Sequence, residues 1–360
     1  MGARSRVGWA LAATIALVIG VVSPGGAVDK LGHVTEFSAG ITPGASPQGI
    51  TAGPDGNLWF TEPLQNRIGR ITPAGEITEF SAGISGDNRP SKITAGPDGN
   101  LWFISNFGTL IGRITPTGEI TELSSGLPDL GGSSGPADIT AGPDGNLWFT
   151  DRAQTRIGRI TPTGEVTEFS AGITPESGLD SITAGPDGNL WFTEADAGHI
   201  ARITPTGEVT EFSTDLGSES APRDLTVGPD GNLWFLMAFP NRIARITRKG
   251  KVTEFDPGFA ADAGLGGLAA GCDGNLWFTA PAVGGGSGIG RITPKGKVTK
   301  FSAGIAPDPE GRLQGIAAGP DANLWFTEQD RIGRIGPGAS PKRQGGRRLT
   351  LPAACPRARP

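Results

Sequence analysis

Two histidines are the only side chains in this sequence whose ordinary pKa lies close to neutral pH. His199 lies near Glu194 and Asp196 in the sequence, and an imidazole beside carboxylates can act as a general base. A solvated surface loop is the competing interpretation of this group. His33 begins a short apolar segment and is expected at the surface. No H-E-x-x-H, G-x-S-x-G, Walker or C-x-x-C motif occurs, so His199 is the candidate base that the residues alone offer.

The block G-P-D-G-N-L-W-F recurs along the chain with small changes. The candidate residues therefore lie within a repeated structural unit. Each unit contains four short apolar segments, for example 182–184, 189–194, 200–204 and 208–213. The turn sequences Gly-Pro-Asp-Gly and Thr-Pro-Thr-Gly join them in pairs, since proline presets φ and glycine takes positive φ. Four strands at a period near 43 residues predict one propeller blade. The repeated tryptophans are Trp59, Trp102, Trp148, Trp191, Trp234, Trp277 and Trp325.

The two ends of the repeated region predict a closed ring. The last unit, 313–335, holds only three strand segments, and an isolated segment Val-Thr-Glu-Phe at 34–37 matches the fourth strand of the other units. Pairing the two would complete the last blade and remove its exposed edges. The alternative is an open solenoid, which needs no such split. We therefore predict an all-β, seven-bladed propeller of four-stranded blades at 28–336, closed by the N-terminal strand.

A propeller of this kind has two unlike faces. Both tight turns of every blade fall on one face, here called the bottom face, and the long, variable connections fall on the other, the top face. Functional residues usually lie on variable loops held by a rigid scaffold, so a site is expected at the channel mouth of the top face. The tryptophans and the repeated charges are expected to pack and pair between blades. These charges are Arg70, Arg113, Arg159, Arg202, Arg245, Arg291 and Arg334, with Glu36, Glu79, Glu122, Glu168, Glu211 and Glu254.

The chain ends differ from the ring in composition. Residues 1–27 combine two arginines, an uncharged apolar stretch and a small-residue cleavage site, which predicts a signal peptide and a secreted or envelope-associated protein. No later segment resembles a membrane span. The tail at 337–360 carries a charge of +6 with no acid and is expected to be disordered. Without both ends, the whole-chain charge of −5 becomes −13, which argues against nucleic-acid binding. A monomer is expected.

The two cysteines are placed for a disulfide. Cys272 replaces proline in a bottom-face turn of the sixth blade, and the tail that carries Cys355 leaves the seventh blade on the same face. An oxidising compartment would permit the bond. Two free thiols are the alternative.

The repeat text resembles the virginiamycin B lyases, or streptogramin lyases, over residues 31–336. The matching units read I-T-A-G-P-D-G-N-L-W-F-T-E followed by I-A-R-I-T-P-T-G-E-V-T-E-F. The resemblance implies a magnesium-dependent enzyme that opens a cyclic depsipeptide by C–O elimination at its ester. It also implies two histidines in the setting P-H-G-I on neighbouring blades, with a metal-binding glutamate fourteen residues later at the end of W-F-T-E.

This sequence departs from that pattern at the histidines. The matching positions are Gln48, Ser91, Ala137, Asp180, Arg223, Gly266 and Gln314. The best-matching pairs are Gln48 with Glu62 and Gln314 with Glu328, on blades that closure makes neighbours. A glutamine amide cannot take a proton near neutral pH, so no catalytic base is predicted there. The resemblance makes Glu62 and Glu328 candidate Mg²⁺ ligands, and the alternative interpretation is solvated loop carboxylates.

Three functions follow. The first is a non-catalytic propeller that binds a small cyclic peptide, or an envelope glycan or protein, at its top face. The second is a Mg²⁺-dependent lyase with a reassigned base such as His199 or Glu62. The third is a lactone or ester hydrolase.

Overall fold

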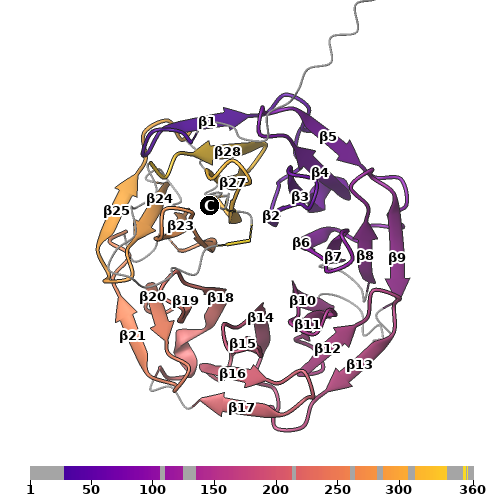
Figure 1. Cartoon of the computed structure of the whole chain (residues 1–360), viewed down its shortest axis with the longest axis vertical. Helices are drawn as coiled ribbons and strands as arrows, with labels where there is room; N and C mark the ends of the chain where they lie inside the picture. The colour runs from indigo at the N-terminus through magenta and orange to yellow at the C-terminus, as the bar shows by residue number, and fades with distance from the viewer. Residues whose placement is uncertain are drawn as a thin grey trace, which may run out of the picture.

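The computed structural model describes residues 28–105, 110–124, 135–212, 216–259, 264–281, 287–306, 313–338, 352–353 and 355. Within them the chain forms seven four-stranded antiparallel sheets around a central axis (Figure 1). The predicted all-β, seven-bladed propeller is confirmed. The predicted signal peptide and most of the basic tail lie outside the described residues.

The first four blades follow one another along the chain. Blade 1 comprises β2 (Ile50–Ala52), β3 (Leu58–Glu62), β4 (Arg67–Ile71) and β5 (Ile77–Phe80). Blade 2 comprises β6 (Pro90–Ala95), β7 (Leu101–Ser105), β8 (Leu110–Ile114) and β9 (Ile120–Ser124). Blade 3 comprises β10 (Pro136–Ala141), β11 (Leu147–Asp151), β12 (Arg156–Ile160) and β13 (Val166–Phe169). Blade 4 comprises β14 (Leu179–Ala184), β15 (Leu190–Glu194), β16 (His199–Ile203) and β17 (Val209–Phe212).

The remaining blades complete the ring. Blade 5 comprises β18 (Pro222–Val227), β19 (Leu233–Met237), β20 (Arg242–Ile246) and β21 (Val252–Phe255). Blade 6 comprises β22 (Leu268–Ala270), β23 (Leu276–Ala280), β24 (Gly288–Ile292) and β25 (Val298–Phe301). Blade 7 comprises β26 (Ile316–Ala318), β27 (Leu324–Glu328), β28 (Arg331–Ile335) and β1 (Val34–Phe37). Short 3-10 turns, η1 (Pro63–Gln65) and η2 (Ser218–Ser220), lie in the connections.

Closure occurs where the sequence predicts it. Strand β1 pairs antiparallel with β28, so that Val34 lies opposite Ile335 and Phe37 lies opposite Ile332. Figure 1 shows the two ends of the ring side by side at this sheet. Because the first strand of the described chain is the outer strand of the last blade, β28 is paired on both sides and blade 7 has four strands like the others.

The core consists of clusters between neighbouring blades. The seven repeated tryptophans are all fully buried. In six blades the tryptophan stacks on the phenylalanine of the outer strand, for example Trp191 on Phe212 with ring centroids 5.0 Å apart. Its indole N–H donates to the turn aspartate four residues earlier, as from Trp191 to Asp187 at 3.0 Å. Each ring packs with isoleucine and leucine side chains of the next blade, as Trp191 does with Leu225 and Leu233.

The repeated charges pair as structural groups. Arg334 stacks over the rings of Phe37 and Trp325 and donates to the carbonyl oxygen of Pro73 in the next blade at 2.9 Å. Glutamates of the outer strands hold the connections between blades: Glu79 accepts from the backbone N–H of Thr42 at 2.5 Å. The expectation of pairing within and between blades is therefore confirmed for these residues.

A disulfide joins Cys272 to Cys355 across 83 residues of sequence. Cys355 is 5% exposed and packs in one cluster with Leu313 and Ile316 of blade 7. The sequence left a bond and two free thiols as alternatives; the structure has the bond, which fastens Cys355 to blade 6. Within the described residues, we find no helical segment with the length and hydropathy of a membrane span.

Candidate functional site

A cavity of about 240 Å³ lies on the axis of the ring. It is bounded by the start of the inner strand, or the residues just before it, in every blade. The lining residues are Gln48–Ile50, Ser91–Ile93, Ala137, Asp138, Ser181, Asp224, Leu225, Gly266–Leu268 and Gln314–Ile316. The predicted positions Gln48 and Gln314 therefore meet in one site, although 266 residues separate them in the sequence.

One side of the cavity is bare peptide. In the three consecutive blades 6, 7 and 1, the residue before the inner strand is glycine: Gly267, Gly315 and Gly49. These blades also have the shortest inner strands, of three residues each. Peptide groups and the side chains of Gln48 and Gln314 therefore form this wall, which offers hydrogen-bond donors and acceptors without a charge.

Threonines of the second strands fix the backbone of this wall. The Thr327 hydroxyl accepts from the backbone N–H of Gly315 at 2.9 Å and donates to the carbonyl oxygen of Gln48 at 2.8 Å. Thr279 donates in the same way to the carbonyl oxygen of Gln314 at 2.7 Å. Each hydroxyl thus joins its own blade to the next at the cavity rim, so the two glutamines are held by neighbouring sheets rather than by loops.

The other side of the cavity carries charges. In blades 2 to 5 the residues that match the three glycines are Lys92, Asp138, Ser181 and Asp224. Ser181 donates from its hydroxyl to Asp138 at 2.9 Å and accepts from the backbone N–H of Leu225 at 3.0 Å. The Lys92 ammonium lies 3.9 Å from an Asp224 carboxylate oxygen.

These charges shift one another's pKa. Loss of solvent opposes the charge on Lys92, but the aspartates of three neighbouring blades outweigh this effect and raise its pKa. The Lys92 side chain stays 46% exposed and cationic at the cavity wall. Burial raises the pKa of Asp224 to about 6, against the attraction of Lys92. The cavity therefore pairs an uncharged amide side with a side that holds a fixed cation and a carboxyl group that titrates close to neutral pH.

The candidate metal ligands Glu62 and Glu328 do not line this cavity. They end β3 and β27 and are 0% and 3% exposed, so neither is a solvated loop carboxylate as the alternative interpretation held. Burial, followed by repulsion from Glu79, raises the pKa of Glu62 to about 8.

Arginines stand beside both carboxylates. Arg67 bonds to Glu79 at 2.5 Å and lowers the pKa of Glu62 against these effects, and Arg331 lies 3.9 Å from Glu328. In blade 1 this guanidinium is bonded to Glu79, and neither oxygen of Glu62 has a hydrogen-bond partner among the described residues. That Glu62 and Glu328 hold Mg²⁺ stays a prediction from the resemblance, and we derive no chemical step through such an ion.

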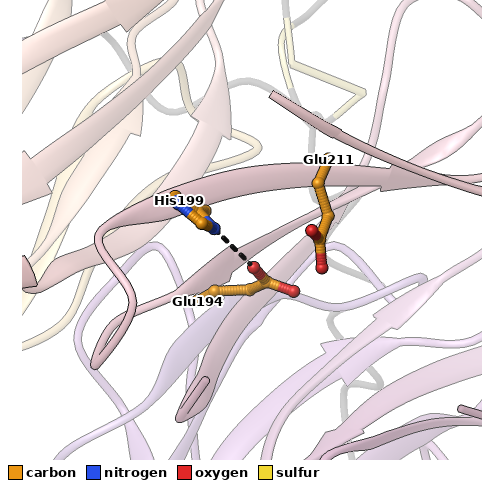
Figure 2. A group of neighbouring side chains, drawn as sticks. All are labelled: Glu194, His199 and Glu211. Carbon is orange, nitrogen blue, oxygen red and sulfur yellow. Dashed lines mark ion pairs between the residues drawn. The ribbon is translucent and has the colours of Figure 1, made fainter. Parts of the chain in front are cut away.

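His199 also lies outside the cavity lining. It begins β16, and its Nδ1 is 3.3 Å from a carboxylate oxygen of Glu194 at the end of β15. Figure 2 shows Glu211 of β17 directed toward the same place. Asp196 bonds instead to Arg152 at 2.9 Å. The structure thus joins His199 to one of the two acids that the sequence suggested and adds a third residue.

Sequence reasoning missed two features of these sites. In the sequence Glu211 is one member of a repeated glutamate series. Its position near His199 follows from the strand register, which pairs Glu211 with Ala201, two residues from His199 on the same face of the strand. Lys92 and Asp224 lie 132 residues apart, and their pairing needs the ring. Both features are marked in the sequence by a departure from the repeat. At the repeat position of Gly49, blades 2, 3 and 5 have a charged residue, and at the repeat position of Arg67, blade 4 has a histidine.

Comparison with known proteins identifies the family and agrees with the propeller fold. Residues 25–170 and 128–343 match the Virginiamycin B lyase family. A streptogramin B lyase structure is 33% identical, with a TM-score of 0.76, over 84% of this chain and 97% of that chain. The Staphylococcus aureus virginiamycin B lyase is 34% identical, with a TM-score of 0.75, over 84% of this chain and 99% of that chain.

A third structure separates binding from catalysis in that relative. It is a catalytically inactive His-to-Ala variant of the Staphylococcus aureus enzyme with quinupristin, 35% identical, with a TM-score of 0.74, over 84% of this chain and 99% of that chain. No curated protein sequence matches this chain significantly. The two family matches together span nearly the whole ring, and the chain is a member of the virginiamycin B lyase family.

Proposed function

We propose that this protein binds a cyclic depsipeptide or a related peptide at the channel mouth and does not open its ester. The observation that carries the proposal is the pair Gln48 and Gln314 at the cavity, where the resemblance places histidines. A glutamine amide donates and accepts hydrogen bonds but takes no proton near neutral pH. Elimination needs a base for the proton beside the ester, and these positions supply none.

The relative with quinupristin supports this separation of binding from chemistry. That structure contains a catalytically inactive variant, in which one histidine is replaced by alanine, together with the ligand. This chain likewise has no histidine at the positions that the resemblance implies, because Gln48 and Gln314 stand there. Secretion, predicted from residues 1–27, is part of the proposal, because a peptide antibiotic or envelope peptide would be met outside the cytoplasm.

The cavity favours part of a peptide rather than a small metabolite. Its volume of about 240 Å³ lies below the range of about 300–1,000 Å³ typical of complete small-molecule pockets. A larger ring-shaped ligand would therefore place one group into the cavity and rest on the top face. Peptide carbonyl and N–H groups would pair with the amide side, and a carbonyl or carboxylate would face Lys92.

The test measures binding and turnover in the same preparation. Isothermal titration with quinupristin should give a saturable signal, and mass analysis after incubation with Mg²⁺ should find the ring intact. Lys92→Ala should weaken the titration signal without unfolding the ring. No binding by the wild type, or efficient linearisation that Glu62→Gln abolishes, would contradict the proposal.

Restoring the histidines tests the same positions from the other direction. We predict that Gln48→His combined with Gln314→His raises linearisation of quinupristin above the wild type, because a general base contributes about 10²–10⁴-fold. Liquid chromatography of the linear product gives the rate. Each single variant serves as the control for a gain that comes from one position. No gain in any of the three variants would show that the missing base is not what separates this protein from its relatives.

One observation favours a second candidate, a lyase with a reassigned base. Asp224 lines the cavity and its pKa is raised to about 6 by burial, which suits a carboxylate for proton abstraction. Neither earlier alternative, His199 or Glu62, lies there. If this candidate holds, the rate of linearisation by the wild type should rise with pH around 6, as Asp224 ionises. Asp224→Asn should abolish this rate, and Glu62→Gln should leave it unchanged.

A further inference from the structure

One position in each blade brings together three strand residues away from the cavity. They are the last residue of the second strand, the first residue of the third strand and the glutamate of the fourth, which blade 6 replaces by Lys300. In blade 1 these are Glu62, Arg67 and Glu79, and in blade 7 they are Glu328, Arg331 and Glu36. The arginine pairs with the outer glutamate, at 2.5 Å in blade 1 and 3.0 Å in blade 7. In blade 7 the same guanidinium also lies 3.9 Å from Glu328, whereas in blade 1 Arg67 acts on Glu62 by its charge alone and lowers the pKa of that carboxyl.

Blade 4 keeps both carboxylates and changes the arginine. Its three residues are Glu194, His199 and Glu211. Histidine replaces a permanent cation with a side chain that can be neutral and offer a nitrogen lone pair. The first residues of the third strands, in blades 1 to 7, are Arg67, Leu110, Arg156, His199, Arg242, Gly288 and Arg331. Blade 4 is therefore the one blade with two carboxylates and an imidazole in this arrangement.

The geometry at blade 4 is that of a cation site. One ligand atom from each of the three side chains lies within 4.8 Å of the other two (Figure 2). The His199 Nδ1 to Glu194 Oε2 distance is 3.3 Å. Two ligands of a tetrahedral ion, each about 2.0–2.1 Å from the metal, lie about 3.3 Å apart.

Glu194 is a buried carboxylate that needs a positive partner. It is 0% exposed, and neither of its oxygens makes a hydrogen bond of good geometry to another described residue. Burial, with repulsion from Glu211 second, raises its pKa to about 8, and the Ser177 hydroxyl opposes this only in part. Leaving such a group charged and unpaired is costly, so either a proton or a cation belongs between the two carboxylates.

Glu211 is already oriented by the fold. Its carboxylate accepts from the backbone N–H of Thr174 at 2.5 Å and from the Thr174 hydroxyl at 3.0 Å. Hydrogen bonds of this kind fix the direction of a metal ligand and strengthen binding. His199 is 30% exposed at its side chain, so an ion can reach the site from solvent.

We propose that Glu194, His199 and Glu211 bind one divalent cation of the zinc type. The donor set of one imidazole and two carboxylates favours Zn²⁺ over Mg²⁺ and Ca²⁺, which prefer oxygen ligands alone. The ion would tie β15, β16 and β17 together and, through Glu211 and Thr174, the connection that precedes β14. None of the three residues lines the channel cavity, so the site is independent of the proposed peptide binding.

The test begins with chelator-treated, intact protein. Titration calorimetry and metal analysis after gel filtration should show one equivalent of Zn²⁺, with weaker Mn²⁺ binding and no retained Mg²⁺, and Zn²⁺ should raise the melting temperature. Absorption of the Co²⁺ form should indicate a tetrahedral site. His33→Gln, which removes the other, exposed histidine, should leave all of these results unchanged.

Two exchanges between blades decide the assignment. His199→Arg gives blade 4 the arrangement of blade 1, so the protein should fold, lose the Zn²⁺ equivalent and show no Zn²⁺-dependent melting shift. Arg67→His gives blade 1 the arrangement of blade 4 and should raise the stoichiometry to two. No Zn²⁺ equivalent in the wild type, unchanged binding in His199→Arg, or one equivalent in Arg67→His would overturn the proposal. If the wild type binds no Zn²⁺, a proton shared between the Glu194 and Glu211 carboxylates would hold them together instead.

Discussion

Individual carboxylates in this ring owe their properties to the side chain opposite them. Glu62 and Glu194 hold the same place in two blades, and both have a pKa raised to about 8 by burial. Arg67 moderates the first, whereas His199 faces the second. Equivalent positions of two blades therefore differ in their chemistry, because the exchange of one arginine for histidine changes the charge beside the buried glutamate.

Glu62 should make the stability of the protein depend on pH. Its folded pKa of about 8 exceeds the ordinary value of 4.5, so between these values the folded state keeps a proton that the unfolded state has lost. Its contribution to stability is therefore greatest below pH 4.5 and is lost as pH rises toward 8, at up to about 1.4 kcal/mol per pH unit.

We predict that Glu62→Gln flattens this part of the stability profile. The measurement is urea unfolding from pH 5 to pH 8 with chelator present. Glu76→Gln, at an exposed position of the same blade, is the control and should keep the wild-type slope. An identical slope in Glu62→Gln would show that Glu62 is ionised in the folded protein throughout this range.

Strands are joined to their neighbours across blades by single hydroxyl groups. Thr61, Thr150, Thr279 and Thr327 each accept from a backbone N–H of their own blade and donate to a carbonyl oxygen of the next. The equivalent residues of blades 2 and 5 are Ile104 and Leu236, which carry no hydroxyl. The second strand thus carries a hydrophobic contact and, in these four blades, a polar bond to the next inner strand.

Thr327→Val should lower the free energy of unfolding by about 1–3 kcal/mol, because it leaves the N–H of Gly315 and the carbonyl of Gln48 without this partner. Valine preserves the shape of threonine, so packing changes little. Denaturant unfolding at neutral pH measures the loss, and Thr327→Ser, which keeps the hydroxyl, should recover most of it. Equal losses in valine and serine would indicate that packing, rather than the hydrogen bonds, explains the effect.

The whole molecule depends on the closure of blade 7. Its outer strand β1 comes from the other end of the ring sequence and pairs over four residues with β28. Deleting residues 28–38 should expose the edge of β28, remove Phe37 from Trp325 and cause aggregation or loss of a cooperative melting transition. Calorimetry and light scattering report both effects. A chain that begins at residue 28 is the control, and a deletion that melts like this control would refute closure by β1.

The disulfide provides a second link across the same region. It joins a turn of blade 6 to the tail that follows blade 7, and a bond that closes a long loop typically contributes about 2–4 kcal/mol. We predict that reduction, or Cys355→Ser, lowers the melting temperature without changing the β-sheet content measured by circular dichroism. Intact mass before and after reductant should differ by two hydrogens. Two free thiols in protein purified without reductant would contradict the bond.

The sequence by itself determined the blade count, the turns and the split last blade. These features are local and repeated: Trp191, for instance, stands at the same distance from its turn aspartate as the tryptophans of the other units, so each unit predicts the same hairpins. The unpaired strand at 34–37 needed only the observation that the final unit lacks one. The same topology placed both cysteines on the bottom face, which permitted a disulfide and left two free thiols as the alternative.

Only the tertiary structure decided which side chains meet. Side chains in a strand alternate between faces, and register selects the partner, so His199 meets Glu194 and Glu211 while Asp196 turns to Arg152. Burial likewise depends on the neighbouring blade: Glu62 reads as a loop-end carboxylate in sequence and is fully enclosed in the ring. Lys92 and Asp224 come together because ring closure, rather than sequence distance, sets what faces the axis.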